Sequence, residues 1–138
     1  MRVMAFDPGA SCGVALIETE PLSIIHLEQL NGKGIVDTPL CRASLKNWLV
    51  MFPADKYVCE DYIGAGYRDK WSVLTLKLIG ILMGCVEDIT MQVPQARKPL
   101  VGTAKEMAEA WMDKPGPHRI DALAHALTYH TKGCKENV

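Results

Sequence analysis

Three strand-like segments precede any helix in this 138-residue chain, and this order constrains its fold more than any other feature. Residues 2–7 form an apolar run that ends in Asp7, a Pro-Gly turn follows, and residues 14–18 are again apolar, which predicts a β-hairpin. Residues 22–30 can form a third strand, and the Gly-rich segment 31–34 is predicted as its terminating loop. Three antiparallel strands are therefore expected first.

Helices and strands alternate after this point. Asp37 is expected to cap a helix that ends at Pro53. Segments 56–61 and 89–93 read as strands, and the apolar segment 70–87 between them reads as a long helix. The apolar face predicted for the first helix consists of Leu40, Leu45, Trp48, Leu49 and Phe52.

Two further helices complete the chain. Thr103-Ala-Lys-Glu106 matches the capping box of a helix start, which predicts a helix over 104–112. Pro117 begins a last helix that Gly133 is expected to end. The element order βββαβαβαα predicts an α/β fold with a five-stranded mixed sheet, built as one domain over residues 1–138.

Composition fits an ordinary folded protein, with 49% hydrophobic and 22% charged residues. Fifteen Lys and Arg against sixteen Asp and Glu give a net charge of −1, without the basic excess common in nucleic-acid-binding proteins. Five cysteines without a C-x-x-C pair favour a reducing cytosolic compartment over a disulfide scaffold or a zinc site. The strongest apolar run, 71–86, contains Lys77 and is shorter than the roughly 20 residues of a membrane span, so no membrane association is expected.

Two acidic residues each end a predicted strand. Asp7 closes the first strand and Glu60 closes the fourth. If these strands lie side by side, the two carboxylates meet at one end of the sheet, where each raises the pKa of the other unless a cation lies between them. Asp61 is expected to point to the opposite side of its strand and ranks below Glu60.

The last helix brings a third acidic group. His118 and Asp121 are three residues apart, so they share one face of the helix and can address one point. His125 falls on the same face one turn later, and simple packing or solvent exposure is expected for it. Three carboxylates and an imidazole, mostly oxygen ligands, are typical of a site for Mg²⁺ or Mn²⁺, and two such ions can drive an in-line phosphoryl displacement.

These motifs, in this order, resemble those of the RuvC family of Holliday junction resolvases, which have an RNase H-like fold. The resemblance covers Asp-Pro-Gly after the first strand, Glu60 at the end of the fourth, and the final-helix sequence HRIDALAHAL. It implies two divalent ions held by Asp7, Glu60, Asp121 and His118. Many relatives carry Asp where this chain has His118, so this residue is either a metal ligand or a group that orients the attacking water.

The resemblance also changes the meaning of the charge. Two bound Mg²⁺ ions would move the formal charge from −1 to +3. The segment 94–105 contains no acidic residue, and basic residues flank the loop after Glu60. Phosphate contacts are therefore expected from Arg68, Lys70, Arg97, Lys98 and Lys105, and ordinary solvent exposure is the alternative for each of them.

Aromatic and apolar residues complete the expectations. Tyr62 and Tyr67 lie where the resembling resolvases present a side chain to unpaired bases, so stacking on DNA is one reading and packing onto the core is the other. The G-x-x-x-G pattern at 80–84 is expected to allow close packing of helix against sheet. The family functions as a homodimer through this helix, and Trp71, Leu78 and Leu82 supply apolar surface for it.

The expected function is a metal-dependent endonuclease that nicks four-way DNA junctions symmetrically and leaves 5′-phosphate and 3′-hydroxyl ends. Other readings are a branched-DNA or flap nuclease of the same fold, a non-catalytic junction-binding protein, and a nucleotide-binding half of an actin-like or sugar-kinase-like protein. The last is disfavoured because that superfamily needs two such domains. The cytoplasm of a bacterium or of a phage-infected cell is the expected location.

Overall fold

The computed structural model describes the backbone of residues 1–62 and 70–136, and the side chains of residues 1–62 and 72–132. Within these residues, five strands form a mixed sheet in the order β3-β2-β1-β4-β5. Strands β1 to β3 pair antiparallel, whereas β4 lies parallel to β1 and β5 lies parallel to β4. This arrangement confirms the predicted sheet. The strands are β1 (Arg2–Asp7), β2 (Ser11–Thr19), β3 (Leu22–Asn31), β4 (Lys56–Glu60) and β5 (Ile89–Gln92).

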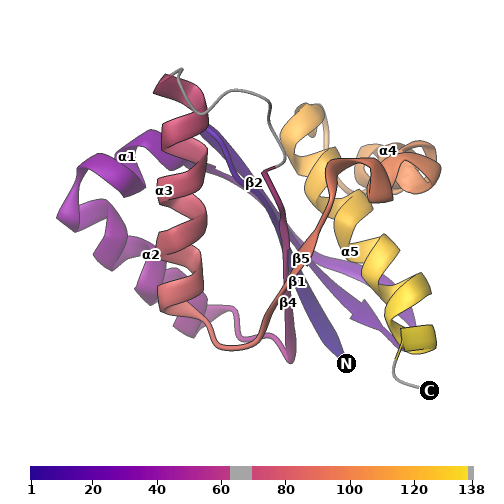
Figure 1. Cartoon of the computed structure of the whole chain (residues 1–138). Coiled ribbons are helices and arrows are strands. Elements are labelled where there is room, and N and C mark those ends of the chain that lie inside the picture. Colours follow the sequence, from indigo (N-terminus) through magenta and orange to yellow (C-terminus); the bar gives the residue numbers. More distant parts are fainter. Residues whose placement is uncertain (63–69, 137–138) are drawn as a thin grey trace.

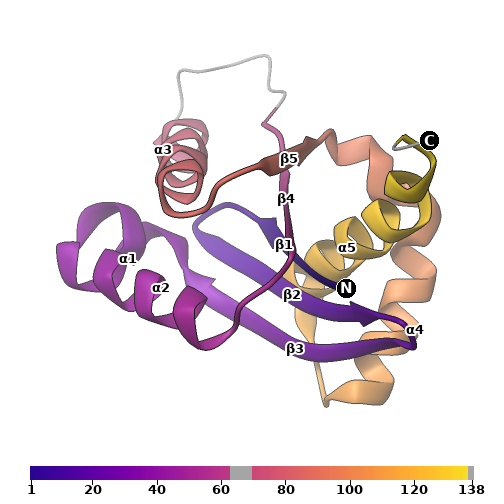
Figure 2. The ribbon, with the colours of Figure 1, turned by 90° about the horizontal axis from the view of Figure 1, so that it is seen from below.

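Helices cover both faces of the sheet and make a three-layer molecule (Figure 1). One face carries α1 (Gly32–Asp37), α2 (Pro39–Met51) and α3 (Lys70–Cys85). The opposite face carries α4 (Val101–Trp111) and α5 (Gly116–Glu136), which the 3₁₀ helix η1 (Pro94–Leu100) connects to β5. Seen from below, α3 and α5 lie on opposite sides of the neighbouring strands β4 and β5 (Figure 2).

The central strand β1 is apolar at successive positions because both of its faces are covered. Val3 and Ala5 belong to the core cluster under α5, whereas Met4 and Phe6 belong to the cluster under α2 and α3. All four side chains are fully buried. The strand is thereby fixed between the two helical layers, which also fixes the position of Asp7 at its end.

The segment after β3 differs from the predicted loop. Strand β3 continues to Asn31, whose side-chain Oδ1 accepts a hydrogen bond from the Gly34 amide at 2.9 Å and caps the short helix α1. Asp37 is the last residue of this helix rather than a cap, and Thr38 takes the cap position of α2. A helix-capping side chain can thus start a short helix in a Gly-rich segment.

The face predicted for α2 is correct except at its start. Leu45 and Leu49 are buried, and Trp48 and Phe52 pack against the same cluster. Leu40, in the first turn of α2, is 75% exposed.

Two helix ends also differ from the sequence prediction. Thr103 does not cap α4, because η1 leads directly into this helix at Val101. Gly133 does not end α5, which continues to Glu136. In both cases the helix runs through a residue that could have bounded it.

The glycines of α3 face outward rather than toward the sheet, which corrects the predicted role of the G-x-x-x-G pattern. A Cβ at Gly80 or Gly84 would meet nothing within 4 Å. Leu78 and Leu82, which were expected to supply apolar surface for a dimer, are instead buried in the core, with 0% and 1% exposed. Among the helices that the structure describes, none is both long enough and apolar enough to cross a membrane.

Candidate active site

The ends of β1 and β4 bring two carboxylates together. The parallel register pairs Phe6 with Cys59, so the next residues, Asp7 and Glu60, are neighbours at the same edge of the sheet. Their side chains hydrogen-bond to each other. Both are largely buried, with 13% and 19% of the side chain exposed. The sequence prediction that these carboxylates meet is confirmed.

Helix α5 supplies the third carboxylate, and Gly13 allows it to approach. A Cβ at Gly13 would collide with the backbone carbonyl of His118, and Gly13 pairs with Asp7 across β1 and β2. The start of α5 therefore lies directly beside Asp7. His118 Nδ1 is 3.4 Å from Asp7 Oδ2, and the histidine side chain is 43% exposed. Asp121 lies one turn further along, on the same face.

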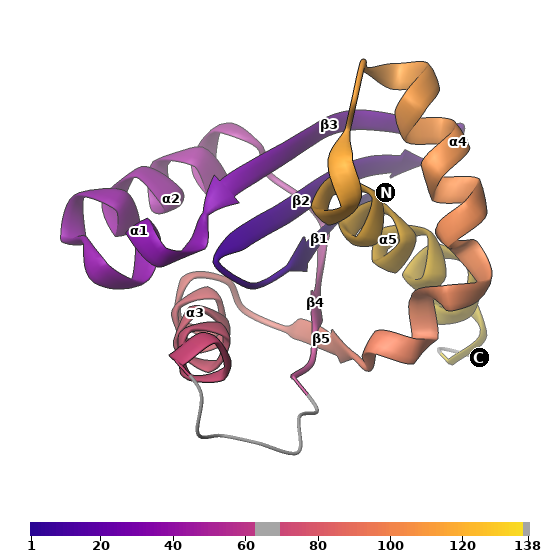
Figure 3. The same cartoon turned by 90° about the horizontal axis from the view of Figure 1, so that it is seen from above.

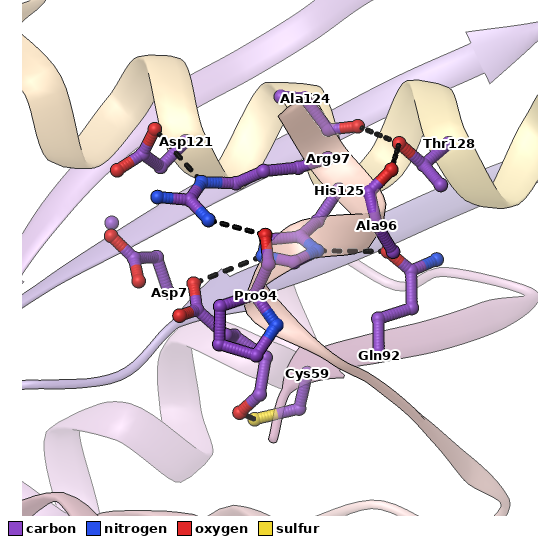
Figure 4. Close-up of polar contacts among 12 residues, drawn as sticks. Asp7, Cys59, Gln92, Pro94, Ala96, Arg97, Asp121, Ala124, His125 and Thr128 are labelled. Atoms are coloured by element: carbon purple, nitrogen blue, oxygen red, sulfur yellow. Dashed lines mark hydrogen bonds and ion pairs between the residues drawn. The ribbon is translucent and has the colours of Figure 1, made fainter. Parts of the chain in front are cut away.

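Arg97 joins the cluster from η1. Its Nε is 3.1 Å from Asp121 Oδ1, and its Nη1 donates to the carbonyl of Pro94 (Figure 4). The guanidinium charge also acts on Asp7 and Glu60. Arg97 was predicted to contact DNA phosphate, and the structure places it on a carboxylate of the site.

Burial and mutual repulsion leave a proton within this cluster. Burial, the hydrogen bond with Glu60 and the negative charges of Glu60 and Asp121 raise the pKa of Asp7 to about 8, against the opposing charge of Arg97. Burial alone would also raise the pKa of Glu60, but hydrogen bonds from His125 and Asp7 hold it below its ordinary value. Asp7 and Glu60 thus share one proton, which resides on Asp7 at neutral pH.

His125 is the residue whose role the sequence did not reveal. Its side chain is 0% exposed, with Nε2 at 2.9 Å from Glu60 Oε2 and Nδ1 at 2.8 Å from Gln92 Oε1. The expectation of simple packing or solvent exposure was wrong. The helical spacing from Asp121 was a usable signal, but only the register of β4 and β5, which pairs Glu60 with Gln92, shows why the imidazole meets both.

The donor set fits a hard divalent cation better than a soft metal. Carboxylates that must otherwise share a proton are suited to Mg²⁺ or Mn²⁺. Burial raises the pKa of the Cys59 thiol, behind the carboxylates, to about 12, so a thiolate ligand is disfavoured. In the conformation described for residues 1–62 and 70–136, no three His, Cys, Asp or Glu side chains already converge as a metal cage, and Arg97 holds Asp121. The metal ligation by Asp7, Glu60, Asp121 and His118 stays a prediction.

The other predicted contacts have different fates. Tyr62 packs against the core, and its hydroxyl is 2.5 Å from Ser72 Oγ, in line with the packing alternative. Lys98 and Lys105 are exposed, and Lys105 Nζ lies 4.0 Å from Glu109 Oε1.

A pocket of about 280 Å³ adjoins the site and is lined by Pro8, Glu60, Asp61, Tyr62, Thr75 and Pro94. Tyr67, Arg68 and the side chains of Lys70 and Trp71 lie outside the described residues.

Solved structures with a similar fold include DNA junction resolvases. Thermus thermophilus RuvC bound to a Holliday junction matches with a TM-score of 0.74 and 18% identity, over 98% of this chain and 96% of RuvC. RuvC from the same organism in a second structure gives 0.73 and 18%, over 99% and 97% of the two chains. The Fowlpox virus resolvase with its junction DNA gives 0.62 and 13%, over 100% and 99%. No protein-family model and no curated protein sequence matches the chain. The chain has the RuvC version of the RNase H-like fold, as predicted.

Proposed function

We propose that this protein is a divalent-metal-dependent endonuclease that resolves four-way DNA junctions by paired, symmetric nicks. The observation that carries this proposal is the cluster of Asp7, Glu60 and Asp121 at the edge of β1 and β4, beside the start of α5. Support comes from the fold, which matches along its full length two resolvases solved with junction DNA. A buried acidic cluster that adjoins an open pocket is a typical place for such chemistry.

Asp7, Glu60, Asp121 and His118 would hold the metal, as one or two Mg²⁺ or Mn²⁺ ions. When bound, such ions activate water and stabilise the charge that develops on the phosphate in an in-line displacement. The remaining work falls to the chain itself. Asp7 gives up its proton when a cation replaces it, and Arg97, 3.1 Å from Asp121, keeps a positive charge beside the carboxylates.

His118 occupies the solvent side of the cluster and suits the role of a proton carrier or of an additional ligand. Its ring is 43% exposed, and Nδ1 faces Asp7. From there the imidazole can accept a proton from a water molecule that attacks a phosphodiester. Such hydrolysis would leave 5′-phosphate and 3′-hydroxyl ends. Lys98 and Lys105 are exposed cations available to more distant phosphates.

Paired nicking requires two sites, and α3 offers a surface for a second copy of the chain. Its outer face carries the exposed residues Val73, Leu76, Gly80, Met83 and Gly84. These positions follow one another at helical spacing and form an apolar stripe opposite the face that packs on the sheet. A two-fold dimer through this stripe would present two sites to the symmetric strands of a junction.

The proposed setting is the cytoplasm of a bacterium or of a phage-infected cell.

A cleavage assay on synthetic DNA tests the proposal. The protein with Mg²⁺ should nick a four-way junction at symmetric positions and should cut a flap and a linear duplex much more slowly. Asp7→Asn and Glu60→Gln should abolish cleavage, whereas Asp61→Asn, a matched change one residue away, should retain most of it. Faster cutting of the flap would favour a flap nuclease. Binding to the junction without any cleavage would favour the alternative that the protein is a non-catalytic junction-binding protein.

A further inference from the structure

The environment of His125 goes beyond what a buried histidine needs for packing. The residue lies on α5 between Ala124 and Ala126, and all three side chains are fully buried. Its two ring nitrogens contact groups from two different strands, Glu60 at the end of β4 and Gln92 at the end of β5 (Figure 4). The imidazole thus bridges the ends of two neighbouring strands from the helix that covers them.

The proton positions follow from the partners. An ionised carboxylate only accepts hydrogen bonds, so Nε2 of His125 carries the hydrogen and donates to Glu60 Oε2 over 2.9 Å. The other nitrogen, Nδ1, is 2.8 Å from the Gln92 side-chain amide. An amide presents an oxygen or, after a half-turn, a nitrogen, so Gln92 can hold the ring whether Nδ1 carries a hydrogen or not. The orientation of His125 is fixed in both cases.

The bond to Glu60 matters because of where that carboxylate lies. Glu60 is only 19% exposed and hydrogen-bonds to Asp7 on one side and to His125 on the other. A ligating carboxylate that a neighbouring donor holds in place binds a metal more tightly than one that can rotate.

We infer that His125 is a positioning residue, which with Gln92 fixes the Glu60 carboxylate in the orientation that binds the divalent cation. The inference rests on the proposed function in one respect, namely that Glu60 is a metal ligand. It assigns no contact with DNA to His125, since its ring is fully buried. It also gives a role to Gln92, which no motif of the sequence marked.

Manganese titration calorimetry on the DNA-free protein tests this role. His125→Leu, close in size but without a donor, should weaken Mn²⁺ binding by about 10–100-fold, the usual cost of losing a partner of a metal ligand. His125→Gln keeps a donor toward Glu60 and should restore most of the affinity. Gln92→Leu, which frees the ring but leaves its bond to Glu60, should lie between them.

Thr128→Val is the matched control on the same helix. Thr128 lies one turn beyond His125, and its buried hydroxyl contacts the carbonyl oxygens of Ala124 at 2.7 Å and Ala96 at 3.4 Å. The substitution removes this hydroxyl and leaves the carboxylates in place. Its Mn²⁺ affinity should equal that of the wild type even if its melting temperature falls. A histidine that serves only the fold would make His125→Leu behave like Thr128→Val.

Several results would overturn the inference. The inference is wrong if His125→Leu binds Mn²⁺ as tightly as the wild type. It is also wrong if His125→Leu and His125→Gln lose the same amount of Mn²⁺ affinity. If His125→Leu does not fold, wild-type affinity in Gln92→Leu decides against the inference, and a reduced affinity there supports it. Junction cleavage by the wild type separates the two proposals. A protein that binds Mn²⁺ in a His125-dependent way but cuts no junction refutes only the proposed function.

Discussion

The two histidines of the α5 face differ in depth, and that difference divides the site into two regions. His118 lies on an outer rim with Asp121 and Arg97, where side chains are 22–43% exposed and the contact to Asp7 is 3.4 Å long. His125 lies on an inner wall with Gln92, fully buried and held at 2.8 and 2.9 Å. Asp7 and Glu60 separate the two regions.

One helical face therefore serves two purposes. Residues seven apart on a helix are about two turns, or roughly 10 Å, from each other along the axis. Helix α5 lies beside α4, on the side of the molecule away from α1 and α2 (Figure 3). Its start lies against Gly13 of β2, and two turns later the ring of His125 contacts Glu60 and Gln92 at the ends of β4 and β5. The first turn can exchange protons with solvent, while the third can only hold other groups in place. The outer rim should therefore control chemistry, and the inner wall should control stability and geometry.

The largest effect is expected from the outer rim. His118→Asn should lower the rate of junction cleavage by about 10²–10⁴-fold, the usual contribution of a general acid or base or of a metal ligand. The melting temperature should change little, because the side chain is 43% exposed. Single-turnover cleavage and thermal unfolding measure the two quantities. If His118→Asn cleaves at the wild-type rate, or if its melting temperature falls by many degrees, the outer rim does not differ from the inner wall in this way.

The inner wall should show the opposite pattern. His125→Leu leaves Glu60 and Gln92 without their buried partner, and an unsatisfied buried polar group costs about 1–3 kcal/mol. Urea denaturation of the metal-free protein should show this loss in the free energy of unfolding, and His125→Gln should show a smaller one. If His118→Asn lowers the free energy of unfolding as much as His125→Leu does, the inner wall contributes no more to stability than the outer rim.

The sequence was sufficient for the sheet and for the positions of His118 and Asp121 in the outer rim. Alternating apolar runs with turn residues predicted all five strands, and the strand-end positions of Asp7 and Glu60 predicted that they meet. The spacing of His118 and Asp121 predicted that both lie at the helix start near Asp7. These predictions depend on short-range periodicity and on the ordinary order of strands in such a fold.

The inner wall could not be predicted because it depends on tertiary distances. The partnership of His125 with Gln92 requires the register between β4 and β5 and the height of α5 above them. Arg97 was assigned to phosphate for a similar reason. Its sequence neighbourhood is basic, but η1 turns the side chain toward Asp121. The helix start predicted at Thr103 was wrong because η1 leads directly into α4 at Val101, which the local capping signal does not show.

Asp7, between the two regions, should destabilise the metal-free protein as pH rises. Its pKa is raised to about 8 from an ordinary value of 3.8, so the folded state keeps a proton that the unfolded chain has lost. The stabilising contribution is fully present below about pH 4 and is lost as pH rises to about 8. Asp7→Asn removes this dependence and should be more stable than the wild type by about 1–2 kcal/mol at pH 8.5.

Thermal unfolding in EDTA at several pH values measures this effect. The melting temperature of Asp7→Asn minus that of the wild type should grow from pH 5 to pH 8.5. Asp61→Asn, next to Glu60, controls for the loss of one negative charge and should show no such trend. A constant difference across this range would mean that Asp7 is already ionised and that Asp7 and Glu60 do not share a proton.

The smallest effect is expected at the outer end of the rim, where Arg97 and a cation compete for Asp121. An ion pair with partners 22% and 25% exposed contributes only about 0–1 kcal/mol. Arg97→Gln should therefore tighten Mg²⁺ binding by at most about fivefold. The titration belongs at pH 9, above the pKa of Asp7, because Arg97 also lowers that pKa and its loss would otherwise favour the competing proton. Lys98→Gln, one residue away and exposed, should leave Mg²⁺ affinity unchanged and reduce only the salt dependence of junction binding. Equal Mg²⁺ affinity in the two variants would show that Arg97 does not compete with the cation for Asp121. Arg97 would then be, like Lys98, a residue that contacts DNA only.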